Sequence, residues 1–147
     1  MKSKNFAFID WQNLYLWTNQ ENWNIDYKKF RIFLKDKYQV SEAYYYLWFL
    51  DEWEQELYSK LQKAGFIIVF REHNKNMKWK KKWNVDVDIV FDIMKNIVEN
   101  EDFDKIVLVS WDWDYIRMVK YLISKDLLLK ILFPSSKYSK RPIARPT

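Results

Sequence analysis

The sequence predicts an α/β domain, with about five mostly parallel strands and helices on both faces of the sheet. Short apolar runs rich in β-branched and aromatic residues alternate along the chain with longer segments whose apolar residues recur at helical spacing. The 147 residues are 49% hydrophobic, which is enough for one domain with a buried core. The pattern contains no internal repeat and no second domain.

Five predicted strands carry the apolar runs, and predicted helices lie between them. The strands are expected at residues 4–10, 41–50, 66–70, 105–109 and 127–133. The helices are expected at 26–37, 51–64, 85–98 and 112–124, with one further helical turn at 12–16. Asp26 is the expected N-cap of the first of these helices, and Gly65 the expected C-cap of the second. Right-handed crossovers then give a three-layer, Rossmann-like fold with strand order 3-2-1-4-5.

Two stretches differ in composition from the rest. Residues 71–84 are rich in lysine and poor in apolar residues, which predicts a loop. Residues 136–147 are basic and contain proline, which predicts a flexible tail after a folded domain at 1–135.

Composition limits the class of protein. Cysteine is absent, so the chain has no disulfides and no thiolate metal ligands, which fits a reducing compartment. No apolar run approaches the roughly 20 residues of a membrane span, and the first residues lack a signal-peptide core. We therefore expect a cytoplasmic protein with no membrane partner. The net charge of +5 is compatible with a polyanionic partner but does not require one.

Glycine and tryptophan occur in unusual numbers, with 1 Gly and 9 Trp. An average chain has about 7% glycine, or roughly 10 residues at this length. Several tryptophans stand in turns that favour glycine: Trp11 follows the first strand, and Trp111 and Trp113 alternate with acids between a strand and a helix. We hypothesise that most of these codons are UGA, from an organism that reads UGA as glycine. The alternative is a genuinely Trp-rich chain whose rings stack on bases.

Four acidic residues stand at junctions between strands and helices. Asp10 ends the first strand, Asp112 and Asp114 follow the fourth, and Asp86 opens the helix before the fourth. The first and fourth strands are neighbours at the switch point of the predicted sheet, so these carboxylates converge at its carboxyl edge. Such a cluster needs a cation or bound protons to offset its repulsion. Oxygen ligands without histidine or cysteine favour Mg²⁺ or Mn²⁺.

Each acid also has a purely structural interpretation. An aspartate after a strand is often a turn former or an N-cap, and Asp86 also suits the first turn of a helix through the helix dipole. Asp88 and Asp92 are more simply explained as a solvated helix face. The four junction acids are more specific as a set than any one of them alone.

Other polar residues are candidates for binding a substrate. Asn13 suits a hydrogen bond to a carboxylate or a phosphate, and Ser110 suits the orientation of Asp112, although both also suit ordinary turns. Lys80, Lys81 and Lys82 form either a contact to RNA phosphates or a solvated loop. His73 is the only histidine, which leaves little room for Ser/His or Cys/His nucleophiles. Glycine-rich dinucleotide-binding and P-loop motifs are absent, even when Trp is read as Gly.

Three segments resemble the motifs of NYN domains, which are relatives of the PIN nucleases. Phe8-Ile-Asp-Trp-Gln-Asn-Leu14 is similar to F-I-D-G-x-N-L in that family. Lys82-Trp-Asn-Val-Asp-Val87 is similar to K-G-x-V-D, and Val109-Ser-Trp-Asp-Trp-Asp-Tyr115 to V-S-G-D-G-D-F. In all three a tryptophan stands where the family has glycine, which supports the recoding hypothesis independently of composition. The resemblance covers about residues 5–133.

The resemblance implies a PIN-like fold and a metal-dependent ribonuclease site. By motif position, that site falls on Asp10, Asp86, Asp112 and Asp114, with Asn13 beside Asp10. The sequence thus predicts an enzyme that cleaves RNA phosphodiester bonds with Mg²⁺ or Mn²⁺.

Two other functions are alternatives to a ribonuclease. The first is an RNA-binding or regulatory module of the same fold, with weak or no catalysis. The second, a phosphoryl-transfer receiver or a phosphatase, is less well supported, because the third strand ends in Phe70-Arg71-Glu72 and residue 12 is Gln. A homo-oligomer is compatible with the sequence, which does not specify the oligomeric state.

Overall fold

The computed structural model describes residues 4–10, 26–47, 55–70, 81–99, 102–110, 115–133 and 145–146. The strands are β1 (Asn5–Asp10), β2 (Val40–Leu47), β3 (Ile67–Phe70), β4 (Ile106–Val109), β5 (Leu128–Phe133) and β6 (Arg145–Pro146). The helices are α2 (Tyr27–Tyr38), α3 (Gln55–Ala64), α4 (Lys81–Glu99) and α5 (Ile116–Ser124). The predicted alternation of strands and helices is confirmed; the helical turn expected at 12–16 lies outside the described residues.

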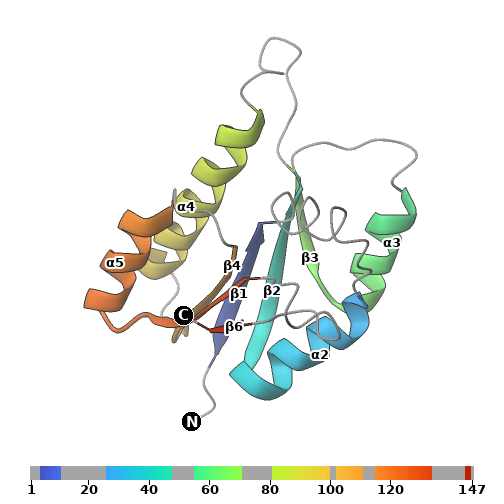
Figure 1. Cartoon of the computed structure of the whole chain (residues 1–147), viewed down its shortest axis with the longest axis horizontal. Helices are drawn as coiled ribbons and strands as arrows, with labels where there is room; N and C mark the ends of the chain where they lie inside the picture. The colour runs from blue at the N-terminus through green and yellow to red at the C-terminus, as the bar shows by residue number, and fades with distance from the viewer. Residues whose placement is uncertain are drawn as a thin grey trace.

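All six strands belong to one sheet, in the order β3-β2-β1-β4-β5-β6. The first five pair in parallel. The predicted order 3-2-1-4-5 and the three-layer α/β fold are therefore confirmed (Figure 1). β1 lies between β2 and β4, which is the switch point of the sheet.

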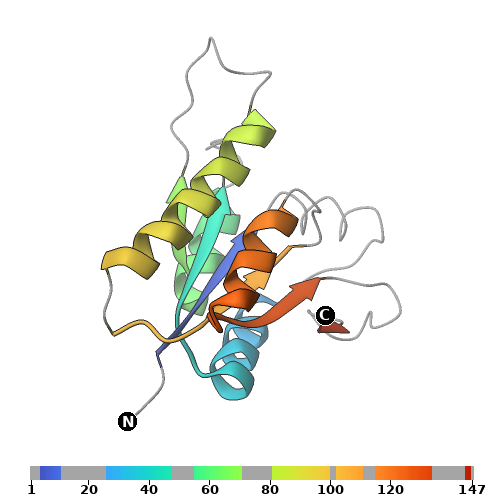
Figure 2. The same cartoon turned by 90° about the vertical axis from the view of Figure 1, so that its left-hand side faces the viewer.

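The two faces of the sheet carry separate apolar cores. Side chains of a strand alternate between faces, so Ala7 and Ile9 pack under α2 and α3, while Phe6 and Phe8 pack under α4 and α5. Figure 2 shows α4 and α5 on the near side of the sheet and α2 behind it. All six residues of β1 are buried because both faces are covered.

Two helix ends have the caps that the sequence predicts. The Asp26 carboxylate accepts a hydrogen bond from the Lys29 backbone N–H at 3.1 Å, which satisfies a free donor of the first turn of α2. Gly65 follows α3 with φ at +103°, a conformation that residues with a side chain rarely adopt. The Phe66 N–H then donates to the Leu61 carbonyl and the Gly65 N–H to the Gln62 carbonyl, which is the Schellman motif of a helix end.

α4 is longer than the sequence predicts. The expected helix at 85–98 extends from Lys81 to Glu99, so the loop prediction is wrong for residues 81–84; residues 71–80 lie outside the described part. Lysine is a good helix former, so a turn that contains Lys81 and Lys82 continues the helix rather than ending it. Asp86 consequently lies in the second turn of α4 rather than at its start.

The end of the chain adds a short strand to the sheet edge. Arg145 pairs antiparallel with Phe133, and Pro146 with Leu132. The sequence predicts a flexible tail from residue 136, and two residues of that tail are in the sheet. Proline is tolerated there because an edge strand need not donate on both sides.

The direction of α4 determines which end of the helix lies near the carboxyl edge of the sheet. α4 connects β3 to β4 and runs antiparallel to the strands, so its amino end projects past their carboxyl ends (Figure 2).

Of the helices within the described ranges, none is both long and apolar enough to cross a membrane.

Candidate functional site

Asp10 is a buried carboxylate at the end of the central strand. It is only 1% exposed, and it pairs in register with Tyr46 of β2. On its other side, Ile9 pairs with Val109, so Ser110 follows β4 next to Asp10. Ser110 is 5% exposed, and its N–H donates to the Leu132 carbonyl at 3.0 Å. The predicted convergence of the ends of the first and fourth strands is thus present for Asp10 and Ser110.

The Asp10 carboxylate is held by the residue that precedes α5. The Tyr115 hydroxyl donates to Asp10 Oδ2 at 3.2 Å, and Tyr115 is itself buried. Burying a carboxylate costs free energy unless donors or cations compensate it. This hydrogen bond therefore stabilises Asp10 and also fixes the start of α5 beside the end of β1.

The importance of Tyr115 was missed from the sequence, although a signal for it exists. It occupies the last position of the V-S-G-D-G-D-F pattern, where the family carries phenylalanine. The extra hydroxyl of a tyrosine in a buried position needs a partner. That substitution pointed to a hydrogen bond with a nearby polar group, and Asp10 supplies the acceptor.

Asp92 has a different environment from the solvated helix face that the sequence predicts. It is half-buried, and its Oδ2 accepts a hydrogen bond from the Tyr46 hydroxyl at 2.7 Å. Burial raises the pKa of the Tyr46 phenol above its usual range, and the hydrogen bond to Asp92 acts in the same direction. Tyr46 therefore remains a donor at neutral pH. The solvated interpretation is wrong for Asp92, because β2 brings in a partner that helical periodicity alone does not reveal.

The backbone of Asp86 lies on a buried stripe of α4. Residues 86, 89 and 93 follow the i, i+3, i+7 spacing of one helix face, and Ile89 and Ile93 of this stripe are fully buried in the core below α4. The stripe approaches the sheet, since α4 contacts β1 and β2. The side chain of Asp86 is outside the described part of the structure, as are those of Lys81 and Lys82.

The remaining predicted site residues fall outside the described residues. They are Asn13, Lys80, Asp112 and Asp114. Of the four acids proposed to hold metal, Asp10 is the one whose side chain is described, and it does not join two other acidic or histidine side chains within the described part of the chain. The structure therefore brings together Asp10 and Ser110, with Tyr115 as an additional member.

The chain was compared with known proteins. The model of the NYN domain family matches residues 6–142. Among curated proteins, it is similar to the Low amplitude and bright protein LabA of Synechococcus elongatus, with 22% identity over 134 residues, covering 85% of this chain and 70% of that protein. Among solved structures, it is similar to a protein of unknown function from Vibrio parahaemolyticus. The TM-score is 0.70 at 24% identity, covering 90% of this chain and 80% of the other, a likeness of fold.

The bond between Tyr115 and Asp10 yields a stability prediction. Replacing Tyr115 with Phe leaves a buried carboxylate without one of its donors, which should lower the free energy of unfolding by about 1–3 kcal/mol. Urea denaturation at neutral pH measures this change. The matched control is Tyr121→Phe in the same helix, where the ring is 46% exposed, and it should change stability by less than about 0.5 kcal/mol. Equal effects of the two substitutions would contradict the role given to Tyr115.

Proposed function

Because the chain belongs to the NYN domain family, we propose that it is a metal-dependent ribonuclease that cleaves RNA phosphodiester bonds. NYN domains are PIN-like nucleases, and the fold described above is of that three-layer type. The site lies at the carboxyl edge of the sheet, where open α/β folds hold their ligands.

The observation that carries the proposal is the buried Asp10 carboxylate. A structural turn-former at the end of a strand is ordinarily solvated, whereas Asp10 is 1% exposed at the switch point of the sheet. Keeping a carboxylate there costs stability unless its environment compensates the charge, and the Tyr115 hydroxyl contributes to that compensation. Such placement is typical of a side chain retained for chemistry rather than for folding.

The donor set fits a hard divalent cation. We propose that Asp10, Asp86, Asp112 and Asp114 hold Mg²⁺ or Mn²⁺, since carboxylate oxygens are the ligands these ions prefer. When bound, the metal supplies charge neutralisation of the phosphate and activation of a water. The chain's own contribution is to fix Asp10 through Tyr115 and to line the edge with negative charge.

Chain connectivity supports the assignment of the other three acids. Asp112 and Asp114 belong to the short connection between Ser110 and Tyr115, both of which flank Asp10. Two residues of chain span at most about 7 Å, so Asp112 cannot be far from Ser110. Asp86 lies in the second turn of α4, whose amino end projects past the same edge (Figure 2).

Basic and polar residues at this edge are proposed to bind the substrate. Lys81 and Lys82 begin α4 and Lys80 precedes them in the sequence, and we propose that their ammonium groups bind RNA phosphates. Asn13 follows β1 and is proposed to bind the phosphate beside Asp10. Ser110 is proposed to orient Asp112 through its hydroxyl.

The proposed active site requires small residues around its acids. Trp111 and Trp113 flank Asp112, where bulky rings keep a phosphate and its ribose from approaching. We therefore propose that most of the nine tryptophans are glycines in the native protein, encoded by UGA. The three family motifs support this, because each has glycine where this sequence has tryptophan.

The tryptophans also favour a second candidate function. If Trp11, Trp83, Trp111 and Trp113 are genuine, their rings stand next to the proposed metal ligands. The chain then fits an RNA-binding or regulatory module, with aromatic stacking on bases in place of turnover.

Replacing Asp112 with Ala separates the two functions. In the enzyme, loss of one metal ligand should reduce Mn²⁺-dependent cleavage of a mixed RNA pool by about 100-fold or more, since several kcal/mol of charge stabilisation are lost. RNA affinity, measured by filter binding, should stay within a few-fold. Asp36→Ala, on an exposed position of α2, should leave both quantities unchanged. A parent protein with no metal-dependent cleavage identifies the module instead.

The recoding hypothesis predicts the mass of the native protein. Each tryptophan replaced by glycine removes one indole side chain, so the intact mass should fall below that of the written sequence in whole multiples of this difference. Mass spectrometry of protein purified from its natural source, followed by peptide mapping, locates each replaced position. An intact tryptophan at position 113 would refute the hypothesis for the active-site turn.

A further inference from the structure

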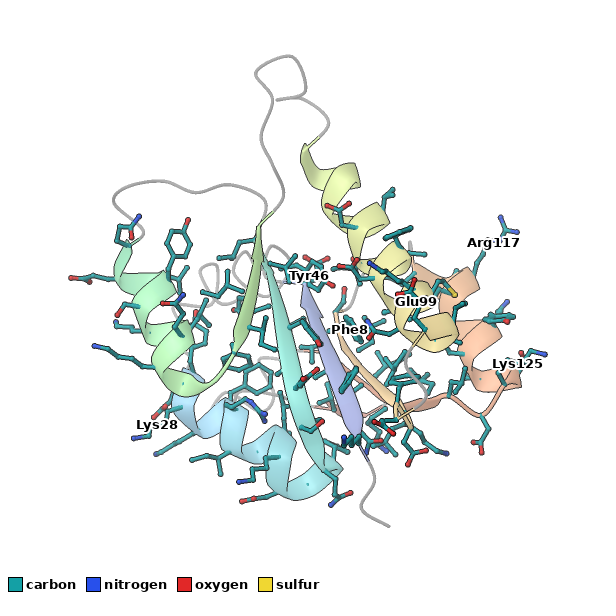
Figure 3. All side chains as sticks on the ribbon, turned by 180° about the vertical axis from the view of Figure 1, so that it is seen from behind. Phe8, Lys28, Tyr46, Glu99, Arg117 and Lys125 are labelled. Carbon is teal, nitrogen blue, oxygen red and sulfur yellow. The ribbon has the colours of Figure 1, made fainter. Side chains whose placement is uncertain are left out.

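A groove lies on the α4 face of the sheet, just below the proposed active site. It is lined by Phe8, Tyr44, Tyr46, Val69, Asp92, Lys95, Asn96 and Glu99, and its volume is about 450 Å³. In Figure 3, Phe8 and Tyr46 lie on the strands, and Glu99 comes from α4 across the groove. This volume is in the range of small-molecule sites, which runs from roughly 300 to 1,000 Å³.

The floor of the groove is aromatic. The rings of Phe8 and Tyr44 stack with centroids 5.2 Å apart and an interplanar angle of 17°. Tyr44 is only partly buried, and Ile67 beyond it is 43% exposed, so the floor is open on the β3 side. Phe8 itself is 0% exposed, so Tyr44 presents the accessible part of this floor, and an aromatic side chain in that position suits a planar ring as ligand.

The side of the groove formed by α4, the α4 wall, presents several hydrogen-bonding groups. Asp92 accepts from the Tyr46 hydroxyl with one carboxylate oxygen. Asn96 donates its amide to the Asp92 carbonyl at 2.8 Å, which leaves its side-chain oxygen as an acceptor. Lys95 and Glu99 lie one helical turn apart, roughly 6 Å, and their charged ends make no hydrogen bond or ion pair within the described part of the chain.

The net charge of the α4 wall favours a neutral base over a phosphate as the ligand of the groove. Among the described residues that line the groove, Asp92 and Glu99 contribute two negative charges against the one positive charge of Lys95. An RNA backbone is repelled by such a wall, whereas the edge of a neutral base carries N–H donors that carboxylates accept.

The aromatic side of the groove lies beside Asp10, one of the proposed metal ligands. Phe8 and Asp10 are on the same side of β1, two residues or about 7 Å apart. Tyr46, at the upper end of the groove, is the register partner of Asp10. A phosphate at Asp10 therefore has its neighbouring base within reach of the aromatic floor.

We propose that this groove binds a guanine base of the RNA substrate, an inference that rests on the proposed ribonuclease function. Guanine presents an N1–H and an amino group side by side, which Glu99 accepts, next to the O6 acceptor that Lys95 donates to. Adenine, cytosine and uracil lack this combination of two adjacent donors and a neighbouring acceptor. The partly buried Tyr44, packed against Phe8, supplies an aromatic contact to the base.

The test is a set of calorimetric titrations of the protein with GMP, AMP, CMP and UMP in the presence of EDTA. EDTA removes divalent ions, so the result does not depend on the proposed metal site. GMP should bind at least roughly tenfold more tightly than the other three. Glu99→Gln should reduce that preference to less than about threefold, whereas the control Glu56→Gln, on exposed α3, should keep it. Equal binding of all four nucleotides, or an unchanged preference in Glu99→Gln, overturns the proposal.

A second measurement separates this inference from the proposed function. Cleavage sites in a mixed RNA pool with Mn²⁺ should show guanine at one fixed position for the parent, and no such preference for Glu99→Gln. Cleavage without a guanine preference contradicts the groove but not the ribonuclease. A pool that stays intact, with GMP still preferred in the titrations, contradicts the ribonuclease but not the groove.

Discussion

The burial of the Asp10 carboxylate in the middle of the sheet is the constraint on which the rest of the structure depends. β1 is covered on both faces, so its last residue has little access to water. The Tyr115 hydroxyl compensates part of this cost, and in doing so it places the start of α5 beside β1. The connection from β4 to α5, with its two aspartates, is thereby tied to Asp10 at both of its ends.

Much of this arrangement follows from local patterns in the sequence. The apolar runs and helical spacings give the strand order, because short parallel crossovers have one favoured hand. Asp26 and Gly65 are recognisable caps, since each acts within a few residues of itself. The bond from Tyr46 to Asp92 was not predictable in this way, because it joins residues that are 46 positions apart. Helical periodicity placed Asp92 off the apolar face, and only the position of β2 provides its partner.

The proposed site and the proposed base groove have complementary electrostatics. Lysines at the start of α4 are suited to phosphates at the carboxyl edge, whereas the acidic wall further along the same helix excludes them. We therefore propose that an RNA strand binds with its backbone at Asp10 and a base toward Tyr44. The tryptophans bear on the first of these contacts. Their identity decides whether the phosphate reaches the acids.

Cleavage of a mixed RNA pool with and without Mn²⁺ tests the central claim most directly. The protein is made in two forms, one with glycine at the nine tryptophan positions and one as the sequence is written. A carboxylate metal site in an open turn predicts Mn²⁺-dependent cleavage by the glycine form, and a much lower rate for the written form. Equal, metal-independent results from both forms would contradict it.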